Sequence, residues 1–188
     1  MIDCSFNELI GKKTIILGEV STGKTVITRK LLEEAVSQNG KITILDFAPP
    51  ERVEKGIKFG GHLYKENRCK VRNIKSDMVK TPRLSAKNSE ELIKMAEFNE
   101  KITSCMLKKF MESPTDTLFI NDVSIYLHKG SLRLLLDVIR RIKTVIINGY
   151  LGEYLDNDHG TGLSRHENIM MHRLAARMDR VIKLEKEA

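Results

Sequence analysis

The segment GEVSTGKT, residues 18–25, constrains the fold more than any other part of the chain. It lies between the apolar run TIIL and the periodic segment VITRKLLEEAV, so it joins an expected strand to an expected helix. Its spacing fits G-x-x-x-x-G-K-[ST] in the strand–loop–helix context that this motif requires. We therefore predict a loop that binds nucleotide phosphates, in preference to a tight turn that contains glycine by chance.

Each residue type in this loop has a physical role. Gly18 and Gly23 allow backbone conformations that other residues avoid, so that successive N–H groups point into one concavity. The concavity opens on a helix N-terminus, whose partial positive charge favours phosphate. Lys24 is expected to reach the β- and γ-phosphates, and the Thr25 hydroxyl to bind Mg²⁺. The residues predicted to bind the nucleotide are Gly18, Glu19, Val20, Ser21, Thr22, Gly23, Lys24 and Thr25.

Strand candidates alternate with helix candidates along most of the chain, a pattern typical of an α/β fold with a parallel sheet. The predicted strands are 13–17, 41–47, 69–74, 115–122, 143–152 and 179–187. The predicted helices are 26–38, 89–113, 131–142 and 164–178. The 188 residues contain no internal repeat or clear boundary, so we expect a single nucleotide-binding domain over residues 1–188.

An irregular basic insert at about residues 56–88 interrupts this pattern. Only two acidic residues oppose nine basic ones there, which are Lys58, Lys65, Arg68, Lys70, Arg72, Lys75, Lys80, Arg83 and Lys87. The whole chain has a net charge of +7. The insert fits a surface for nucleic acid or an acidic partner, a lid that closes on a small substrate, or a solvated surface.

The sequence has no apolar run close to the ~20 residues that a membrane-spanning helix needs. The N-terminal segment MIDCSFNELIGKK also lacks the basic and apolar regions of a signal peptide. We expect a cytoplasmic protein without a membrane segment. Cys4, Cys69 and Cys105 are odd in number and widely spaced, which argues against a disulfide framework and a structural zinc site.

A second element of the site is the apolar strand TLFIND. It ends in Asp122, whose carboxylate could hold Mg²⁺ opposite the phosphate loop. Farther along, residues 152–167 contain Asp156, Asp158, His159 and His166. Their spacing matches no standard metal-ligand pattern, so a hydrated loop is favoured there over a second metal site.

With these motifs, the chain resembles the P-loop NTPases, and within them the RecA/KaiC-like ATPases of the additional-strand class. GEVSTGKT fits the Walker A pattern and LFIND the Walker B pattern, while ARMDRVIKLE is similar to the helix and closing strand of KaiC and archaeal recombinase relatives. The resemblance implies a three-layer α/β/α P-loop NTPase fold with a mainly parallel central sheet. It also implies that the strand TVIING lies between the phosphate-loop strand and the Walker B strand.

The resemblance further implies roles for individual residues. Asn148 occupies the position of a polar γ-phosphate sensor, and Asp46 and Glu51 are the candidates for the acid that positions the attacking water. Arg165 is a candidate for an arginine that reaches the γ-phosphate of a neighbouring subunit in a homo-oligomer, the alternative being a surface arginine at the start of a helix.

The function expected from these features is an ATP-binding, Mg²⁺-dependent ATPase whose hydrolysis drives a conformational change in itself or in a partner. ATP is favoured over GTP because no N-K-x-D signature follows the Walker B strand. Two alternatives stay open. One is a small-metabolite kinase that uses the basic insert as a lid, and the other is a nucleotide-gated module that binds nucleic acid.

Overall fold

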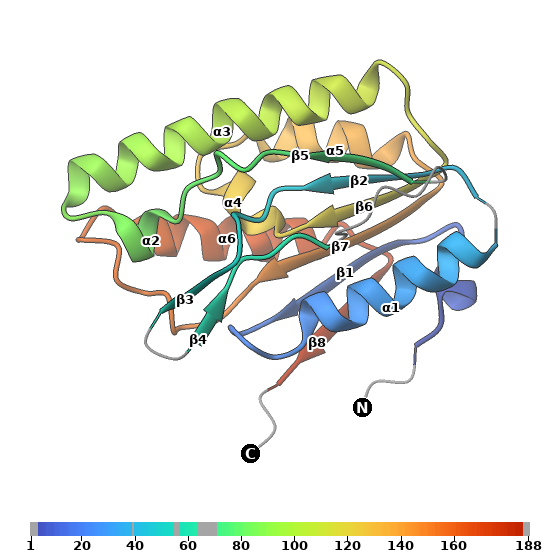
Figure 1. Cartoon of the computed structure of the whole chain (residues 1–188), viewed down its shortest axis with the longest axis horizontal. Coiled ribbons are helices and arrows are strands. Elements are labelled where there is room, and N and C mark those ends of the chain that lie inside the picture. The colour runs from blue at the N-terminus through green and yellow to red at the C-terminus, as the bar shows by residue number, and fades with distance from the viewer. Residues whose placement is uncertain (1–3, 39, 55–56, 64–70, 186–188) are drawn as a thin grey trace.

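The computed structural model describes residues 4–38, 40–54, 57–63 and 71–185. Six parallel strands form a central sheet in the order β5-β2-β6-β7-β1-β8, and helices cover both faces of the sheet (Figure 1). This arrangement confirms the predicted three-layer α/β/α fold class with a parallel central sheet. The strands are β1 (Lys13–Gly18), β2 (Ile42–Asp46), β3 (Arg52–Glu54), β4 (Ile57–Phe59), β5 (Val71–Lys75), β6 (Thr117–Asn121), β7 (Thr144–Tyr150) and β8 (Arg180–Leu184).

The helices divide between the two faces of the sheet. The short 3-10 helix η1 and helix α1 cover one face, and α3, α4, α5 and α6 cover the other (Figure 1). Their bounds are η1 (Phe6–Leu9), α1 (Lys24–Ser37), α2 (Pro82–Ser85), α3 (Ser89–Met111), α4 (Val123–Leu127), α5 (Leu132–Arg140) and α6 (Leu163–Ala175).

The apolar runs form central strands because both of their faces are buried. In β1, Ile15 and Leu17 pack into the core beneath α3 to α6, whereas Ile16 packs into the core beneath α1. All three side chains are at most 1 % exposed. This is the alternation that the two-residue period of a strand requires, and it explains why the run is apolar throughout.

Strand β7 lies between β1 and β6. It pairs in parallel with β1 from Lys13 opposite Val145, and with β6 from Thr117 opposite Thr144. The expectation that TVIING separates the phosphate-loop strand from the Walker B strand is therefore confirmed. This order brings the carboxyl ends of β1, β7 and β6 side by side at one edge of the sheet, where open α/β sheets bind ligands.

The basic segment is less irregular than predicted, because its second half belongs to the main fold. Strand β5 pairs in parallel with β2 and forms one edge of the sheet, which confirms the short strand expected at 69–74 with a shift toward the C-terminus. Strands β3 and β4 pair antiparallel in a separate two-stranded sheet that the sequence did not indicate. Lys65, Arg68 and Lys70 lie outside the described residues.

The start of α1 and the presence of α4 differ from expectation for physical reasons. Helix α1 begins at Lys24, two residues before the predicted start, because the phosphate loop ends directly in the first helical turn. The apolar residues after Asp122 form α4, a buried five-residue helix. In the sequence this apolar segment resembles a continuation of the strand, because a helix of five residues is too short to show the helical hydrophobic period.

In the described part of the chain, none of the helices is both long enough and apolar enough to cross a membrane.

Candidate nucleotide-binding site

The GEVSTGKT loop, predicted to bind phosphates, joins the end of β1 to the start of α1, which is the strand–loop–helix context that the sequence predicted. Gly23 has φ 86° and lies in the left-handed region directly before the first helical residue. Gly18 is required for a different reason. A Cβ atom on it would lie 2.6 Å from Thr22 Oγ1 and 2.7 Å from the carbonyl oxygen of Leu184, closer than such contacts occur. Gly23 is thus needed for the backbone conformation of the turn, and Gly18 is needed because other atoms lie close to its Cα.

Lys24 points back along this loop. Its Nζ donates to the carbonyl oxygen of Glu19 at 2.5 Å. Burial lowers the pKa of Lys24 below its ordinary value, and the nearby carboxylates of Asp122 and Glu19 oppose that shift. An ammonium group that is largely desolvated and only partly compensated is a strong attractor for phosphate oxygens.

A pocket of ≈ 130 Å³ lies at the carboxyl ends of the central strands. It brings together several of the residues that the sequence singled out, namely Val20, Ser21, Lys24, Thr25, Asp122 and Asn148. A second pocket of ≈ 280 Å³ continues around the loop and adds Thr22, Gly23 and Glu51. Among the predicted nucleotide-binding residues, Gly18 and Glu19 line neither pocket.

Asp122 is held in an unusual conformation at the end of β6. Its φ of 56° and ψ of 57° place a non-glycine residue in the left-handed region, where strain is tolerated only if neighbours fix it. The Ser124 hydroxyl donates to its Oδ1 at 2.6 Å, and its own N–H donates to Asn148 Oδ1 at 2.8 Å. Burial, the largest effect, raises the pKa of Asp122, while Ser124 and Lys24 lower it in part. The carboxyl group is therefore pre-positioned in the pocket.

Asn148 belongs to a buried chain of amides beneath the pocket. Its Nδ2 donates to Thr28 Oγ1 at 3.0 Å and to Asn121 Oδ1 at 2.9 Å, and its Oδ1 accepts from the Asp122 N–H. Both amide protons are thus committed within the protein. In this arrangement Asn148 orients Asp122, and it has no amide proton left to donate to a γ-phosphate.

Asp46 extends this chain of buried hydrogen bonds and lines neither pocket. Its side chain is fully buried and accepts from Asn121 Nδ2 and from the Leu63 N–H, each at 2.7 Å. These contacts explain why a carboxylate at the end of β2 turns inward, since it satisfies buried donors from two other segments. Glu51, the other candidate acid, lines the pocket beside the phosphate loop.

Glu19 fastens the phosphate loop to the segment that follows β7. Its carboxylate accepts from the Val20 N–H at 2.6 Å, from the Glu153 N–H at 2.8 Å and from the Tyr154 N–H at 3.0 Å. Burial tends to raise the pKa of Glu19, but these backbone donors outweigh it and lower the pKa below its ordinary value. Gly152 makes the approach possible, because a Cβ there would lie 2.2 Å from Glu19 Oε2.

The loop at residues 152–167 is ordered by its own side chains. Asp158 accepts from the N–H groups of Gly160 and Ser164, each at 3.0 Å, and so caps the start of α6. The described residues contain no group of three or more His, Cys, Asp or Glu side chains that could hold a metal ion. Arg165 is exposed in the first turn of α6.

Several of the bases in the predicted basic insert have internal contacts. Arg72 donates to the carbonyl oxygens of Ser113 and Lys109, both at 2.8 Å, and so caps the C-terminal end of α3. The Arg83 side chain is 6 % exposed and paired with Glu167. In this conformation a positive surface therefore cannot include Arg83, whereas Arg72 stays partly exposed.

His62 lies beside the phosphate loop between two carboxylates. Its Nδ1 is 3.5 Å from Asp46 Oδ1, and its Nε2 is 2.9 Å from Asp77 Oδ1. The pKa of His62 is raised, mainly by Asp46 and further by Asp77, while burial and the charge of Lys75 oppose the shift.

The raised pKa of His62 predicts a pH-dependent stability. Because the folded pKa exceeds the unfolded value of about 6.5, the stabilisation is complete below that pH and is lost as pH rises through the folded pKa. The wild type should therefore exceed His62→Gln in free energy of unfolding by more at acidic than at alkaline pH. Urea titrations check this, with the exposed His166→Gln as control. A difference that is the same at both pH values contradicts it.

The comparisons with known proteins complete the description of the site. No protein-family model matches the chain, and no curated protein is significantly similar to it. Among solved structures, the flagellar accessory protein FlaH from Methanocaldococcus jannaschii is similar, with 14% identity, a TM-score of 0.44, and coverage of 93% of this chain and 71% of that one. The Pif1 helicase from Candida albicans has 15% identity and a TM-score of 0.38. That match covers 95% of this chain and only 37% of the helicase. Neither likeness carries an argument about what this chain binds.

Proposed function

We propose that the chain is an ATP-binding, Mg²⁺-dependent ATPase of the RecA/KaiC-like type, whose hydrolysis drives a conformational change in itself or in a partner. One observation carries the proposal. Lys24, Thr25 and Asp122 line a single pocket at the carboxyl ends of β1 and β6, with β7 between these strands. A desolvated cation, a hydroxyl and a carboxylate around a helix N-terminus form a set that suits a nucleotide triphosphate and its metal.

The donor set in the pocket suits Mg²⁺, which prefers oxygen ligands and binds through few protein groups. Thr25 would supply its hydroxyl and Asp122 its carboxylate. The bound ion would neutralise charge that develops on the phosphate oxygens.

On nucleotide binding, Lys24 would exchange the Glu19 carbonyl oxygen for oxygens of the β- and γ-phosphates. The loop N–H groups and the first turn of α1 would hold the remaining phosphate oxygens. The choice of ATP rests on the family resemblance and on the missing guanine-reading signature.

Glu51 is the residue we assign to the attacking water, because it lines the second pocket, around the phosphate loop, whereas Asp46 lines neither pocket. Glu51→Gln should lower ATP turnover by about two to four orders of magnitude, the usual contribution of a group that moves a proton, while ATP affinity is kept. Asp46→Asn should act mainly on stability, since it disturbs buried hydrogen bonds worth about 1 to 3 kcal/mol.

Single-turnover hydrolysis, nucleotide affinity and urea unfolding of the two variants test this assignment. A Glu51→Gln variant that turns over ATP at the wild-type rate would remove Glu51 from the mechanism. If Asp46→Asn instead loses turnover with unchanged stability, the catalytic acid is Asp46.

A cavity next to the nucleotide pocket favours the phosphotransferase as the second candidate function. It has a volume of ≈ 350 Å³ and shares Phe59 and Leu155 with the nucleotide pocket, so that a small acceptor could lie beside the phosphates. ADP release from ATP should be measured with buffer alone, with pooled metabolites and with single-stranded RNA or DNA. Release that requires metabolites supports the phosphotransferase, whereas turnover in buffer or with nucleic acid supports the ATPase.

A further inference from the structure

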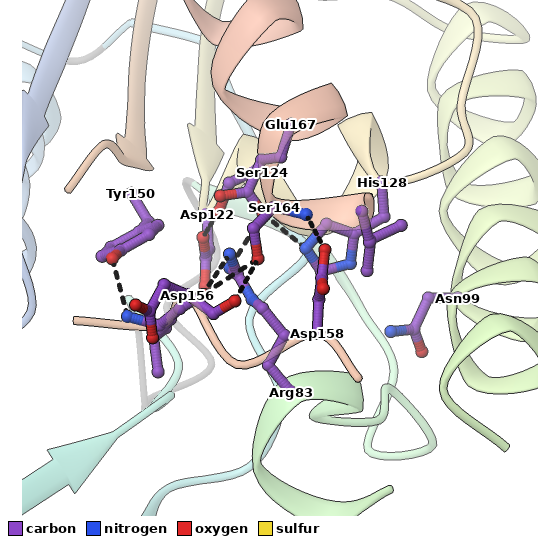
Figure 2. Close-up of polar contacts among 12 residues, drawn as sticks. Arg83, Asn99, Asp122, Ser124, His128, Tyr150, Asp156, Asp158, Ser164 and Glu167 are labelled. Carbon is purple, nitrogen blue, oxygen red and sulfur yellow. Dashed lines mark hydrogen bonds and ion pairs between the residues drawn. The ribbon is translucent and has the colours of Figure 1, made fainter. Parts of the chain in front are cut away.

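Three polar side chains from three separate helical segments meet in the interior beside Asp122 (Figure 2). Glu167 of α6 accepts from Arg83 Nη2 at 2.8 Å, and the same oxygen lies 2.5 Å from Nε2 of His128. The side chains of Arg83, Glu167 and His128 are only 6 %, 3 % and 1 % exposed. Nothing in the sequence indicated this cluster, because its members lie at distant positions and match no motif.

The chemistry of the cluster fixes the orientation of His128. A carboxylate that is paired with a guanidinium can only accept, so Nε2 of His128 carries the proton and donates it to Glu167. The other ring nitrogen, Nδ1, is buried and has no hydrogen-bond partner among the described residues. The ring is thus held from one side by Glu167.

A short helix connects this anchored ring to Asp122. Helix α4 spans only Val123–Leu127, and His128 is its C-terminal cap, whose N–H donates to the Ser124 carbonyl oxygen at 3.2 Å. The Ser124 hydroxyl in turn donates to Asp122 Oδ1. Because α4 is one rigid turn of helix, anchoring His128 at one end restricts the strained Asp122 at the other.

Arg83 ties the same cluster to the wall of the nucleotide pocket. Its Nη1 donates to the Leu155 carbonyl oxygen at 3.0 Å, and its guanidinium lies 5.1 Å from the centre of the Tyr150 ring. Both Leu155 and Tyr150 line the pocket that holds Asp122. The cluster therefore contacts α4 through His128 and the lining of the pocket through Arg83.

We propose that Glu167 and His128 are positioning residues for Asp122, which set the direction of its carboxylate for the metal of a bound nucleotide. This inference rests on the proposed function, and it adds two residues that hold the expected metal ligand Asp122 in place. Buried ion pairs contribute little net stability, and buried partners that hydrogen-bond around a metal ligand typically orient it, which fits the place of this pair behind α4.

The matched variants His128→Gln and His128→Asn test the inference. The amide nitrogen of Gln can reach the place of Nε2 and donate to Glu167, whereas the shorter Asn side chain cannot. The measured quantity is the ratio of the dissociation constants of a fluorescent ATP analogue without and with Mg²⁺. We expect the wild-type ratio for His128→Gln and a ratio lower by about 10- to 100-fold for His128→Asn and Glu167→Ala, the usual loss when a metal ligand loses its support.

The controls separate positioning from stability. Glu90→Gln breaks an exposed pair with Lys94 on α3 and should leave the ratio unchanged. If His128→Asn fails to fold, Ser124→Ala removes the last link of the same chain and should lower the ratio in the same way.

Folded variants that lose thermal stability but keep the wild-type ratio would overturn the inference while leaving the proposed function intact. A wild type whose nucleotide affinity is independent of Mg²⁺ would overturn both.

Discussion

Lys24→Ala is expected to lower ATP turnover by about two to four orders of magnitude. The substitution removes the largely desolvated ammonium group that faces the phosphate position, and among the residues that the structure describes no second lysine or arginine lines the ≈ 130 Å³ pocket. Charge that develops on the phosphate oxygens would then be stabilised by the loop N–H groups and the metal alone.

Steady-state phosphate release with saturating Mg²⁺ and ATP measures this effect. Lys30→Ala, an exposed lysine on the same helix, provides the control and should keep the wild-type rate. Lys24→Ala that hydrolyses ATP as fast as the wild type would show that the pocket is not the site of turnover.

Asp122→Asn should have the second-largest effect, and one that depends on the metal. We expect a loss of about two orders of magnitude in Mg²⁺-dependent turnover, because a charged metal ligand becomes neutral. Nucleotide affinity measured without metal should change little, since Lys24 and the loop N–H groups still hold the phosphates.

Paired titrations with ATP, one with Mg²⁺ and one with a chelator, measure the two effects separately. The exposed Asp116→Asn serves as the control carboxylate near the other end of β6. Equal losses with and without metal would identify Asp122 as a structural residue at the end of the strand.

The sequence predicted the central architecture because local patterns encode it directly. The glycines of the phosphate loop mark one turn and one close contact, and the apolar runs mark strands buried on both faces. The position of β7 between β1 and β6 followed from the family resemblance, and the hydrogen-bonded pairs of these strands confirm it.

Other features could not be predicted because they depend on tertiary contacts. Strands β3 and β4 have only three residues each, too few to show an alternating pattern. Asp46 is the last residue of β2 and Glu51 follows this strand, and only the structure shows that the Leu63 N–H and the Asn121 amide turn Asp46 inward. Likewise, Asn148 is committed to Asp122, a contact between residues that are 26 positions apart.

The buried cluster of Arg83, His128 and Glu167 illustrates the same limit. Arg83 stands in a basic stretch and reads as part of a positive surface, yet the fold turns it inward onto a glutamate 84 residues away. The sequence around a single charged residue does not indicate whether its side chain will form an ion pair in the interior.

The most direct test of the nucleotide site is a structure of the full chain with a non-hydrolysable ATP analogue and Mg²⁺. We expect the phosphates to contact Lys24 Nζ and the N–H groups of the phosphate loop, and Mg²⁺ to bind Thr25 on the side that faces Asp122. An analogue that binds elsewhere, or that does not bind at millimolar concentration, would show that this pocket is not the nucleotide site.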